Sequence, residues 1–291
     1  MTDLGLSTEK GQGVNSLSGK ASANGFSSGL RRTLLDTGDA DEAQRADQLM
    51  QGAEDMNNIV FATKSAIRIM TDELVVNHNV ILLPNVRDEF ITDMLKSRVE
   101  EYGKAIYVID IPFYDANSNR LYVNERGISD GRPDVDATSE KFNSRELNSS
   151  YVATYFPDVM VLDSSDPSEA AINSQRSIKV PSSIVALGAF AKTDAITSPW
   201  FAPAGFSRGA LGTITSTDVR LNAEDRDTLY ESRINPIANF PNKQFVIFGQ
   251  KTSQLARTAL DRVNVRRLVL EVKRRIEIIA QRLLFEQNNS A

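Results

Sequence analysis

A strand–helix–strand pattern between residues 79 and 112 constrains the fold of this chain more than any other feature. Two short apolar runs, NVILLPN (79–85) and KAIYVIDIP (104–112), flank the segment DEFITDMLKSRVEEYG (88–103). The apolar side chains of the middle segment recur near helical spacing and stop at Gly103, which predicts a helix closed by a glycine. Because strands joined by a crossover helix are usually parallel, the pattern predicts a βαβ unit in an α/β sheet.

Further apolar segments extend this sheet. SSYVATYFPDVMVLD (149–163) predicts an extended or helical entry, broken at Pro157, and then a buried strand. VPSSIVALGAFAKTDA (180–195) begins with a proline and two serines, which predicts a capped helix packed closely on the sheet. QFVIFGQKT (244–252) predicts a short strand, whereas polar residues 115–150 predict a turn or mobile loop. The predicted fold class is therefore α/β, a mixed sheet flanked by helices, with long loops.

The end of the chain predicts a long amphipathic helix. Residues 257–285 contain no glycine or proline, and apolar side chains recur through the segment at Leu260, Val263, Leu268, Val272, Ile276, Ile279 and Leu283. The remaining positions are unusually basic for a chain of formal net charge -5; they include Arg257, Arg262, Arg266, Arg267, Lys273, Arg274, Arg275 and Arg282. Two interpretations are open: a solvated helix face, or a contact face for an acidic partner.

The segment SPWFAPAGFSRGAL (198–211) predicts an ordered loop anchored by aromatic side chains. It holds the single tryptophan of the chain, Trp200, together with Phe206. Pro203 and Gly205 interrupt any helix or central strand, because one fixes φ and the other permits positive φ. We expect a fixed turn at Pro203–Gly205, burial of Trp200 and Phe201, and an outward Arg208. The loop either covers a core or forms a surface that meets other subunits.

Composition excludes several kinds of chemistry. The chain has no cysteine and one histidine, His78, which removes thiolate catalysis, cysteine-ligated metals and paired histidine ligands. GQKTS (249–253) has only the closing half of a phosphate-binding loop, and the acidic stretches at 130–136 and 163–169 lack the spacing of a calcium loop. We therefore predict no catalytic, cofactor-binding or metal-binding residues. The alternative is a doubly wound enzyme with a carboxylate site at Asp110, at the end of the second predicted strand.

Seven short motifs occur in one order along the chain: YFP (155–157), VPSS (180–183), AKTDA (191–195), APAG (202–205), INPI (234–237), FGQKT (248–252) and VNVRRL (263–268). In this order they resemble the contractile tail sheath proteins of myovirus-type bacteriophages. The resemblance covers residues ~40 to 291 and marks as structural motif positions Trp200, Pro203, Gly205, Phe206, Asn235 and Pro236.

The resemblance implies a mechanical function and no enzymatic activity or cofactor. Sheath subunits polymerise around a tail tube and contract to drive the tube through the host envelope. Implied partners are other sheath subunits, the tube, the baseplate and the tail terminator, with no nucleic acid and no membrane insertion. The implied location is the virion, after assembly in the host cytoplasm. The seven basic residues from Arg257 to Arg275 are then candidates for subunit or tube contacts. A pyocin or type VI-like injection sheath is the alternative within this class.

The same resemblance suggests how the chain is divided. Residues 1–40 are rich in glycine and serine and predict a flexible lead-in or loop, and residues 41–57 predict a helix. We expect two parts of the sheath core at residues 41–163 and 164–291. Sheath proteins usually continue beyond the point where this chain stops, so we expect a truncated or protease-trimmed core that is monomeric.

Overall fold

The computed structural model describes residues 58–121, 131–162, 177–241 and 243–285. The predicted lead-in at 1–40 and the predicted helix at 41–57 lie outside this part. No helix in the described ranges is long and apolar enough to cross a membrane.

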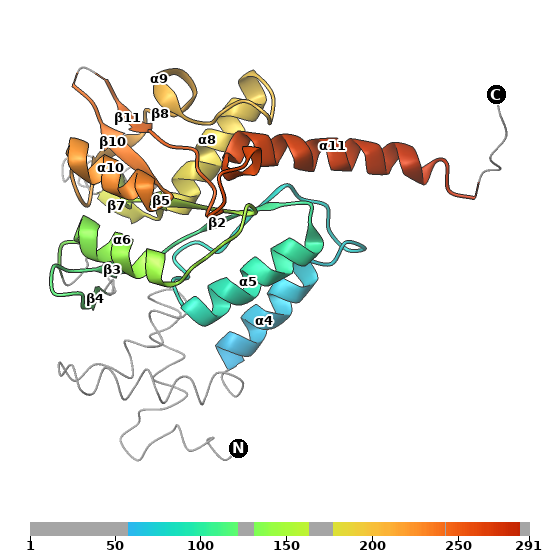
Figure 1. Ribbon diagram of the computed structural model, residues 1–291, viewed down its shortest axis with the longest axis horizontal. Helices are drawn as coiled ribbons and strands as arrows, with labels where there is room; N and C mark the ends of the chain where they lie inside the picture. The colour runs from blue at the N-terminus through green and yellow to red at the C-terminus, as the bar shows by residue number, and fades with distance from the viewer. Residues whose placement is uncertain (1–57, 122–130, 163–176, 242, 286–291) are drawn as a thin grey trace, which may run out of the picture.

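A six-stranded mixed sheet forms the centre of the molecule (Figure 1). In spatial order its strands are β1 (Val80–Leu82), β2 (Ile106–Ile109), β5 (Val152–Phe156), β10 (Ile234–Asn239), β11 (Phe245–Ile247) and β8 (Ala210–Leu211). The first four strands run parallel to one another, and β11 is antiparallel to both of its neighbours. The predicted mixed sheet is confirmed.

The predicted βαβ unit is present. Helix α5 (Glu89–Tyr102) connects β1 to β2, which pair in parallel with Val80 opposite Ile106. The Asp88 side chain accepts hydrogen bonds from the backbone N–H groups of the first turn. Gly103 ends the helix at φ 64°, a left-handed conformation in which glycine has no steric penalty.

Helices cover both faces of the sheet. Successive side chains on a strand point to opposite faces, so the apolar residues of a buried strand form a core on each side. On β2, Tyr107 and Ile109 belong to one core, and Ile106 and Val108 belong to the other. The first core includes side chains from α4 (Asn58–Met70), α5, α6 (Val135–Ser144) and α10 (Ala223–Glu231). The second includes α8 (Ser182–Ile196) and the first turns of α11 (Val263–Gln281). The predicted helical flanks are therefore confirmed.

Smaller elements surround this core. They are the hairpin β3 (Phe113–Tyr114) and β4 (Arg120–Leu121), the antiparallel sheet β7 (Ser177–Val180), β6 (Val159–Leu162) and β9 (Ile214–Thr217), the short helix α9 (Gly205–Arg208) and the 3-10 turn η2 (Ala259–Asp261). Strands from both predicted parts of the chain share the central sheet. The predicted boundary at 163/164 falls at the start of the undescribed residues 163–176, and the division stays a prediction.

Two predictions at element boundaries were wrong, and a third was correct in part. Within the segment 115–150, residues 135–144 form α6, because Asp134 caps the helix and Phe142 packs into the first core. In the segment 149–163, the extended alternative and the break at Pro157 are confirmed by β5 and the cis Phe156–Pro157 peptide, but the strand that follows, β6, belongs to the smaller sheet and is only partly buried. The last helix begins at Val263 rather than near residue 257, because η2 and Arg262 precede it in non-helical backbone.

The INPI and FGQKT motifs meet at one buried side chain, Asn235. Its amide donates to the carbonyls of Thr154 (2.9 Å) and Lys251 (2.8 Å) and accepts from the Lys251 N–H (2.6 Å). Gly249 lies against it, because a Cβ there would come within 2.8 Å of the Asn235 oxygen. The neighbouring Pro236 carbonyl accepts from the N–H of Phe248. Asn235 thus joins β5, β10 and the segment that follows β11.

Asn235→Ala should lower the free energy of unfolding by about 2–4 kcal/mol, because it leaves several buried backbone groups without a partner. Urea denaturation measures this change. Asn239→Ala, in the same strand but exposed, should cost under about 0.5 kcal/mol. Equal effects at the two positions would show that the Asn235 hydrogen bonds do not stabilise the sheet.

Candidate interaction surfaces

Asp110 follows β2 and caps helix α8 from outside the helix. One carboxylate oxygen accepts from the Ser183 N–H (3.1 Å), and the other accepts from the Ser183 hydroxyl (2.8 Å) and from the Asn85 N–H (2.8 Å). The predicted helix start is confirmed, but neither serine acts as the N-cap: Pro181 occupies that position and makes no side-chain cap. The free N–H groups of the first turn are satisfied by an aspartate from another strand.

Asp158 caps the same helix and links it to two buried cations. It accepts from the Ser182 N–H at 3.1 Å, pairs with Arg87, and lies 3.8 Å from the Lys179 ammonium. Lys179 also pairs with Asp218 at 2.5 Å. The Arg87 guanidinium, 4.0 Å from the centre of the Phe113 ring, donates to the Ile111 carbonyl. We refer to Arg87, Asp110, Asp158, Lys179 and Asp218 as the buried ion cluster.

Burial alters the charges of this cluster. Burial raises the pKa of Asp110, and Arg87 only partly offsets it. Burial also raises the pKa of Asp218, against the opposing effect of Lys179. Burial alone would lower the pKa of Arg87, but the carboxylates of Asp158 and Asp110 outweigh it and the pKa is raised. Because the pKa of Asp110 is higher folded than unfolded, its contribution to stability is present at low pH and lost as pH rises.

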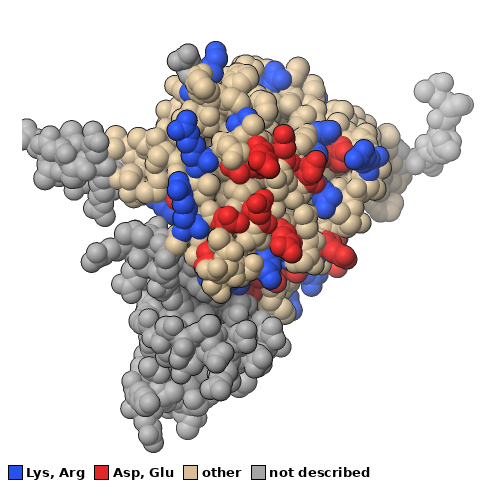
Figure 2. Space-filling view, turned by 60° about the vertical axis from the view of Figure 1, so that its left-hand side comes forward, with Lys and Arg blue, Asp and Glu red and all other residues tan. Residues whose placement is uncertain are grey.

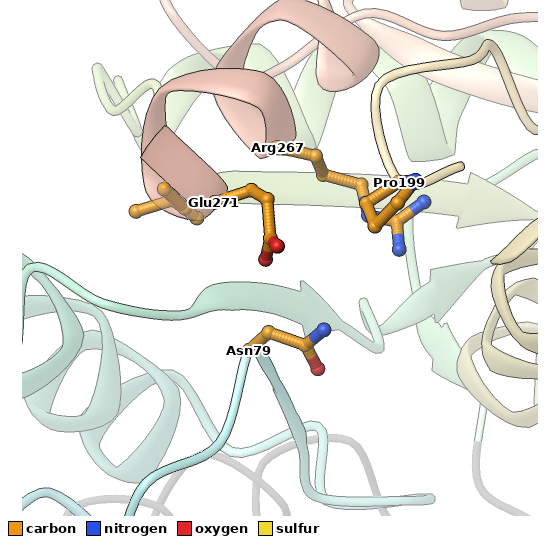
Figure 3. A pocket seen from close by; sticks show the side chains of 5 residues that line it. Asn79, Pro199, Arg267 and Glu271 are labelled. Atoms are coloured by element: carbon orange, nitrogen blue, oxygen red, sulfur yellow. The ribbon is translucent and has the colours of Figure 1, made fainter. Parts of the chain in front are cut away.

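The carboxylate at the sheet end is therefore structural. Asp110 is 1% exposed, and backbone and hydroxyl donors of α8 and of the loop after β1 occupy both its oxygens. A small hollow of about 10 Å³ lies elsewhere, where Asn79, Pro199, Arg267 and Glu271 face one another (Figure 3). Pockets for small molecules are usually about 300–1,000 Å³. The enzymatic alternative at Asp110 is not favoured.

Metal-ligating residues do not gather in the described part of the chain: no group of three or more His, Asp or Glu side chains there could hold an ion. His78 is half-buried and stacks on Tyr102, with ring centres 5.0 Å apart. Burial lowers its pKa, with a smaller effect from Arg274. This histidine packs against the end of α5.

The aromatic loop at 198–211 forms a partly exposed surface. Pro203 is buried and Gly205 adopts φ 83°, as expected for a fixed turn. The expected burial of Trp200 and Phe201 was wrong: they are 37% and 41% exposed, although Ala204 of the same loop packs against the second core. Arg208 does not point outward; it donates to the Ala202 carbonyl (3.0 Å) and lies over the Phe201 ring.

Three phenylalanines extend this surface. Phe206 packs edge-on against Phe240, with ring centres 5.1 Å apart, and Phe240 lies 4.9 Å from Phe248. Phe206 and Phe248 are 51% and 44% exposed. The loop was predicted either to cover a core or to form a surface for other subunits. It has features of both, because its proline is buried and its aromatic rings reach solvent.

Two of the candidate contact residues on α11 are buried. Arg266 is 5% exposed, bonds to the Ser150 hydroxyl, and lies over the Tyr151 ring at 4.0 Å. Arg267 is 3% exposed and pairs with Asp194 at 2.5 Å. These two arginines attach the helix to the domain and are not available to a partner in this structure.

The other basic candidates have mixed environments. Arg262 bonds to the Tyr230 hydroxyl and Lys273 donates to the Gly103 carbonyl at 3.0 Å. Arg274 and Arg275 both pair with Glu271, at 3.7 and 2.8 Å. Exposed side chains remain at Arg257, Lys273 and Arg275. The structure thus does not bring the seven basic residues together on one face.

The apolar side of α11 faces solvent. The helix extends away from the body of the molecule (Figure 1), and Val272, Ile276, Ile279 and Leu283, near its free end, are 44%, 59%, 61% and 66% exposed. This arrangement reverses the usual orientation of an amphipathic helix. The sequence pattern identified the stripe of apolar residues but could not show which side of the helix packs on the domain.

Acidic side chains gather on another face. Figure 2 shows Asp and Glu residues clustered on the side of the molecule that lies to the left in Figure 1. Helix α10, on that side, carries exposed Glu224, Asp227 and Glu231. These residues were not predicted to be functional, although the sequence of α10 places four carboxylates within nine residues.

The Asp110 carboxylate is occupied by internal hydrogen-bond donors, and apolar, aromatic and charged side chains are exposed on the surface. This combination favours the class of assembly proteins over enzymes. Comparison with known proteins makes this specific. Residues 127–253 match the family model of the phage tail sheath protein central domain. This match supports the resemblance to tail sheath proteins over residues 127–253.

Curated relatives are tail sheath proteins of three phages. The chain is 41% identical to that of Vibrio phage KVP40 over 102 residues, which is 35% of this chain and 15% of that protein. It is 33% identical to that of Enterobacteria phage T4 over 111 residues, which is 38% of this chain and 17% of that protein. For Salmonella phage ViI the identity is 31% over 103 residues, covering 35% of this chain and 16% of the relative.

Solved structures show the same fold. The helical sheath of the anti-feeding prophage in its contracted state has a TM-score of 0.52 at 22% identity, over 81% of this chain and 55% of that one. The contracted PVC sheath of an extracellular contractile injection system has a TM-score of 0.52 at 22% identity, over 77% of this chain and 53% of that one. The chain thus spans about half the length of these sheath proteins.

Asp158→Ala should lower the free energy of unfolding by about 3–5 kcal/mol, because it leaves a buried guanidinium without its partner. Chemical denaturation at neutral pH measures the loss. Asp93→Ala removes a carboxylate that is 52% exposed from its pair with Arg145, and should cost at most about 1 kcal/mol. A loss at Asp158 no greater than that at Asp93 would contradict a stabilising role for the cluster.

Arg267→Ala should destabilise the fold by about 1–3 kcal/mol, since it removes packing and leaves Asp194 unpaired. Arg275→Ala, on the same helix but exposed, should change stability by under about 0.5 kcal/mol. Thermal unfolding of the two variants separates the buried arginine from the exposed one. Similar melting temperatures would argue that α11 is held to the domain without Arg267.

Proposed function

We propose that this chain is a subunit, or part of a subunit, of the contractile tail sheath of a bacteriophage, and that it has no enzymatic activity. The observation that carries the proposal is the match of residues 127–253 to the sheath central domain. Tail sheath proteins are virion components, and we propose that this chain joins the virion after assembly in the host cytoplasm.

The proposed activity is mechanical. Sheath subunits form a helical polymer around a tail tube, and contraction of the polymer drives the tube through the host envelope. Free energy for such a transition comes from interfaces with two discrete arrangements, and it requires no bound nucleotide. The fold supports this role, because the central sheet, its helical layers and the buried ion cluster make a rigid body that can move as a unit.

The proposed partners are other sheath subunits, the tail tube, the baseplate and the tail terminator. For the tube we propose contacts through the exposed basic residues Arg257, Lys273 and Arg275, which are weak enough at a solvated surface to break during contraction. Arg266 and Arg267 support these contacts indirectly, by holding α11 in place.

A sheath of a non-phage injection system is the alternative within this class. The solved structures of the anti-feeding prophage and PVC share the fold with this chain at 22% identity. The curated phage sheath proteins are 31–41% identical over about a third of the chain. The higher identity supports the phage assignment.

Electron microscopy tests the function. The sheath protein that contains this sequence, expressed with its tail tube protein, should form striated sheaths around tubes. A combined charge reversal of Arg257, Lys273 and Arg275 to Glu should abolish coating of the tubes, with a melting temperature within about 2 °C of wild type because all three side chains are exposed.

The exposed Lys141→Glu on α6 is the matched control and should leave coating intact. Coating that survives the triple reversal would exclude the proposed tube contacts. Uniform small particles in place of sheaths, with the unaltered protein and its tube, would contradict the proposed function itself.

A further inference from the structure

Helix α11 carries a continuous apolar seam with coiled-coil spacing. The seam residues follow one another at alternating intervals of four and three, beginning at Val265 and continuing through Val269, Val272, Ile276, Ile279 and Leu283. This is the 3.5-residue repeat of positions that face a partner helix in a coiled coil. Five of the six are β-branched, and the four from Val272 onward are 44–66% exposed.

The seam and the attachment face lie on opposite sides of the helix. Val263 is fully buried and Leu270 is 3% exposed, and both pack into the second core. Val272 follows Val263 by nine residues, which at about 100° per residue places it half a turn away around the axis. Packing onto this domain therefore cannot cover the seam.

Basic residues flank the seam on both sides. With Val272 and Ile279 at heptad position d, Lys273 occupies e, and Arg275 and Arg282 occupy g. No carboxylate occupies these flanking positions between residues 272 and 283. Of the two acidic residues of the helix, Glu271 pairs with Arg274 and with the flanking Arg275, and Glu277 pairs with Lys104 at 2.7 Å.

We propose that the seam of α11 is a docking surface for an amphipathic helix of another polypeptide whose own apolar seam is flanked by Asp or Glu. Charge disfavours an antiparallel pair with α11 of a second copy, because the g-position residues Arg275 and Arg282 would face one another. The acidic helix α10 of a second copy does not fit either, because its apolar Leu229 is fully buried. The inference goes beyond the sheath assignment and rests on α11 alone.

Binding of designed peptides to the intact chain tests the proposal. The probe is a labelled helical peptide of about three heptads, with Leu and Ile at the seam and Glu at every flanking position, and its partner has Lys in place of each Glu. Fluorescence anisotropy should show that the Glu peptide binds about ten-fold or more tightly than the Lys peptide. Arg275→Glu combined with Arg282→Glu should reverse this preference.

Substitutions within the seam supply the structural controls. Ile276→Asp combined with Ile279→Asp should abolish binding of the Glu peptide and leave the melting temperature unchanged, because both side chains face solvent. Ile278→Asp, equally exposed but off the seam, should bind normally. Equal affinity for the two peptides, or unchanged binding by the seam variant, would overturn the proposal. So would a wild-type dimer in sedimentation that the seam variant loses, since a second copy would then be the occupant.

Discussion

The buried pairing of Asp158 with Arg87 is the interaction on which the rest of the structure depends. Asp158 lies at the turn between β5 of the central sheet and β6 of the smaller one, and it also caps α8. Asp110 completes the cap from the end of β2. A charge pair of this kind contributes little net stability against an apolar replacement, but removal of one member is costly. Its effect is to fix how two sheets and a helix meet, so the domain has one arrangement of its layers.

Much of the fold follows from local patterns in the sequence. The βαβ unit was predictable because Gly103 closes an apolar helix between two strand-like runs, and α8 was predictable from Pro181 and the small apolar residues after it. The prediction failed at α6, where Asp134 and Phe142 stabilise a helix in a polar stretch through tertiary packing that spacing does not reveal. The break at Pro157 was predictable, but the sequence did not reveal that the strands before and after it belong to different sheets.

Tertiary packing also decides which of the candidate contact residues are exposed, and the sequence does not reveal it. Residue type identified α11 as basic and amphipathic, and the sequence motifs indicated the resemblance that the central-domain match supports. Which side of the helix packs on the domain depends on Val263 and Leu270, whose burial is decided by the position of α8 and β2 far away in sequence. Arg266 and Arg267 were therefore placed among the exposed cations, although Tyr151 and Asp194 hold them inside. Trp200 was misjudged for a related reason, because an aromatic residue in a loop can pack at an edge.

The attachment of α11 at one end has a mechanical consequence. Its buried residues lie between Val263 and Leu270, whereas the helix continues to Gln281 and, at about 1.5 Å per residue, is about 28 Å long. Its apolar packing thus forms a pivot at the first two turns, and its later contacts with the domain are polar, from Lys273 to the Gly103 carbonyl and from Glu277 to Lys104. When these polar contacts break, a rotation of about 10° about Leu270 displaces Gln281, about 16 Å further along the axis, by about 3 Å. Small changes in the packing of Arg267 against α8 are thereby passed to the far end of the helix.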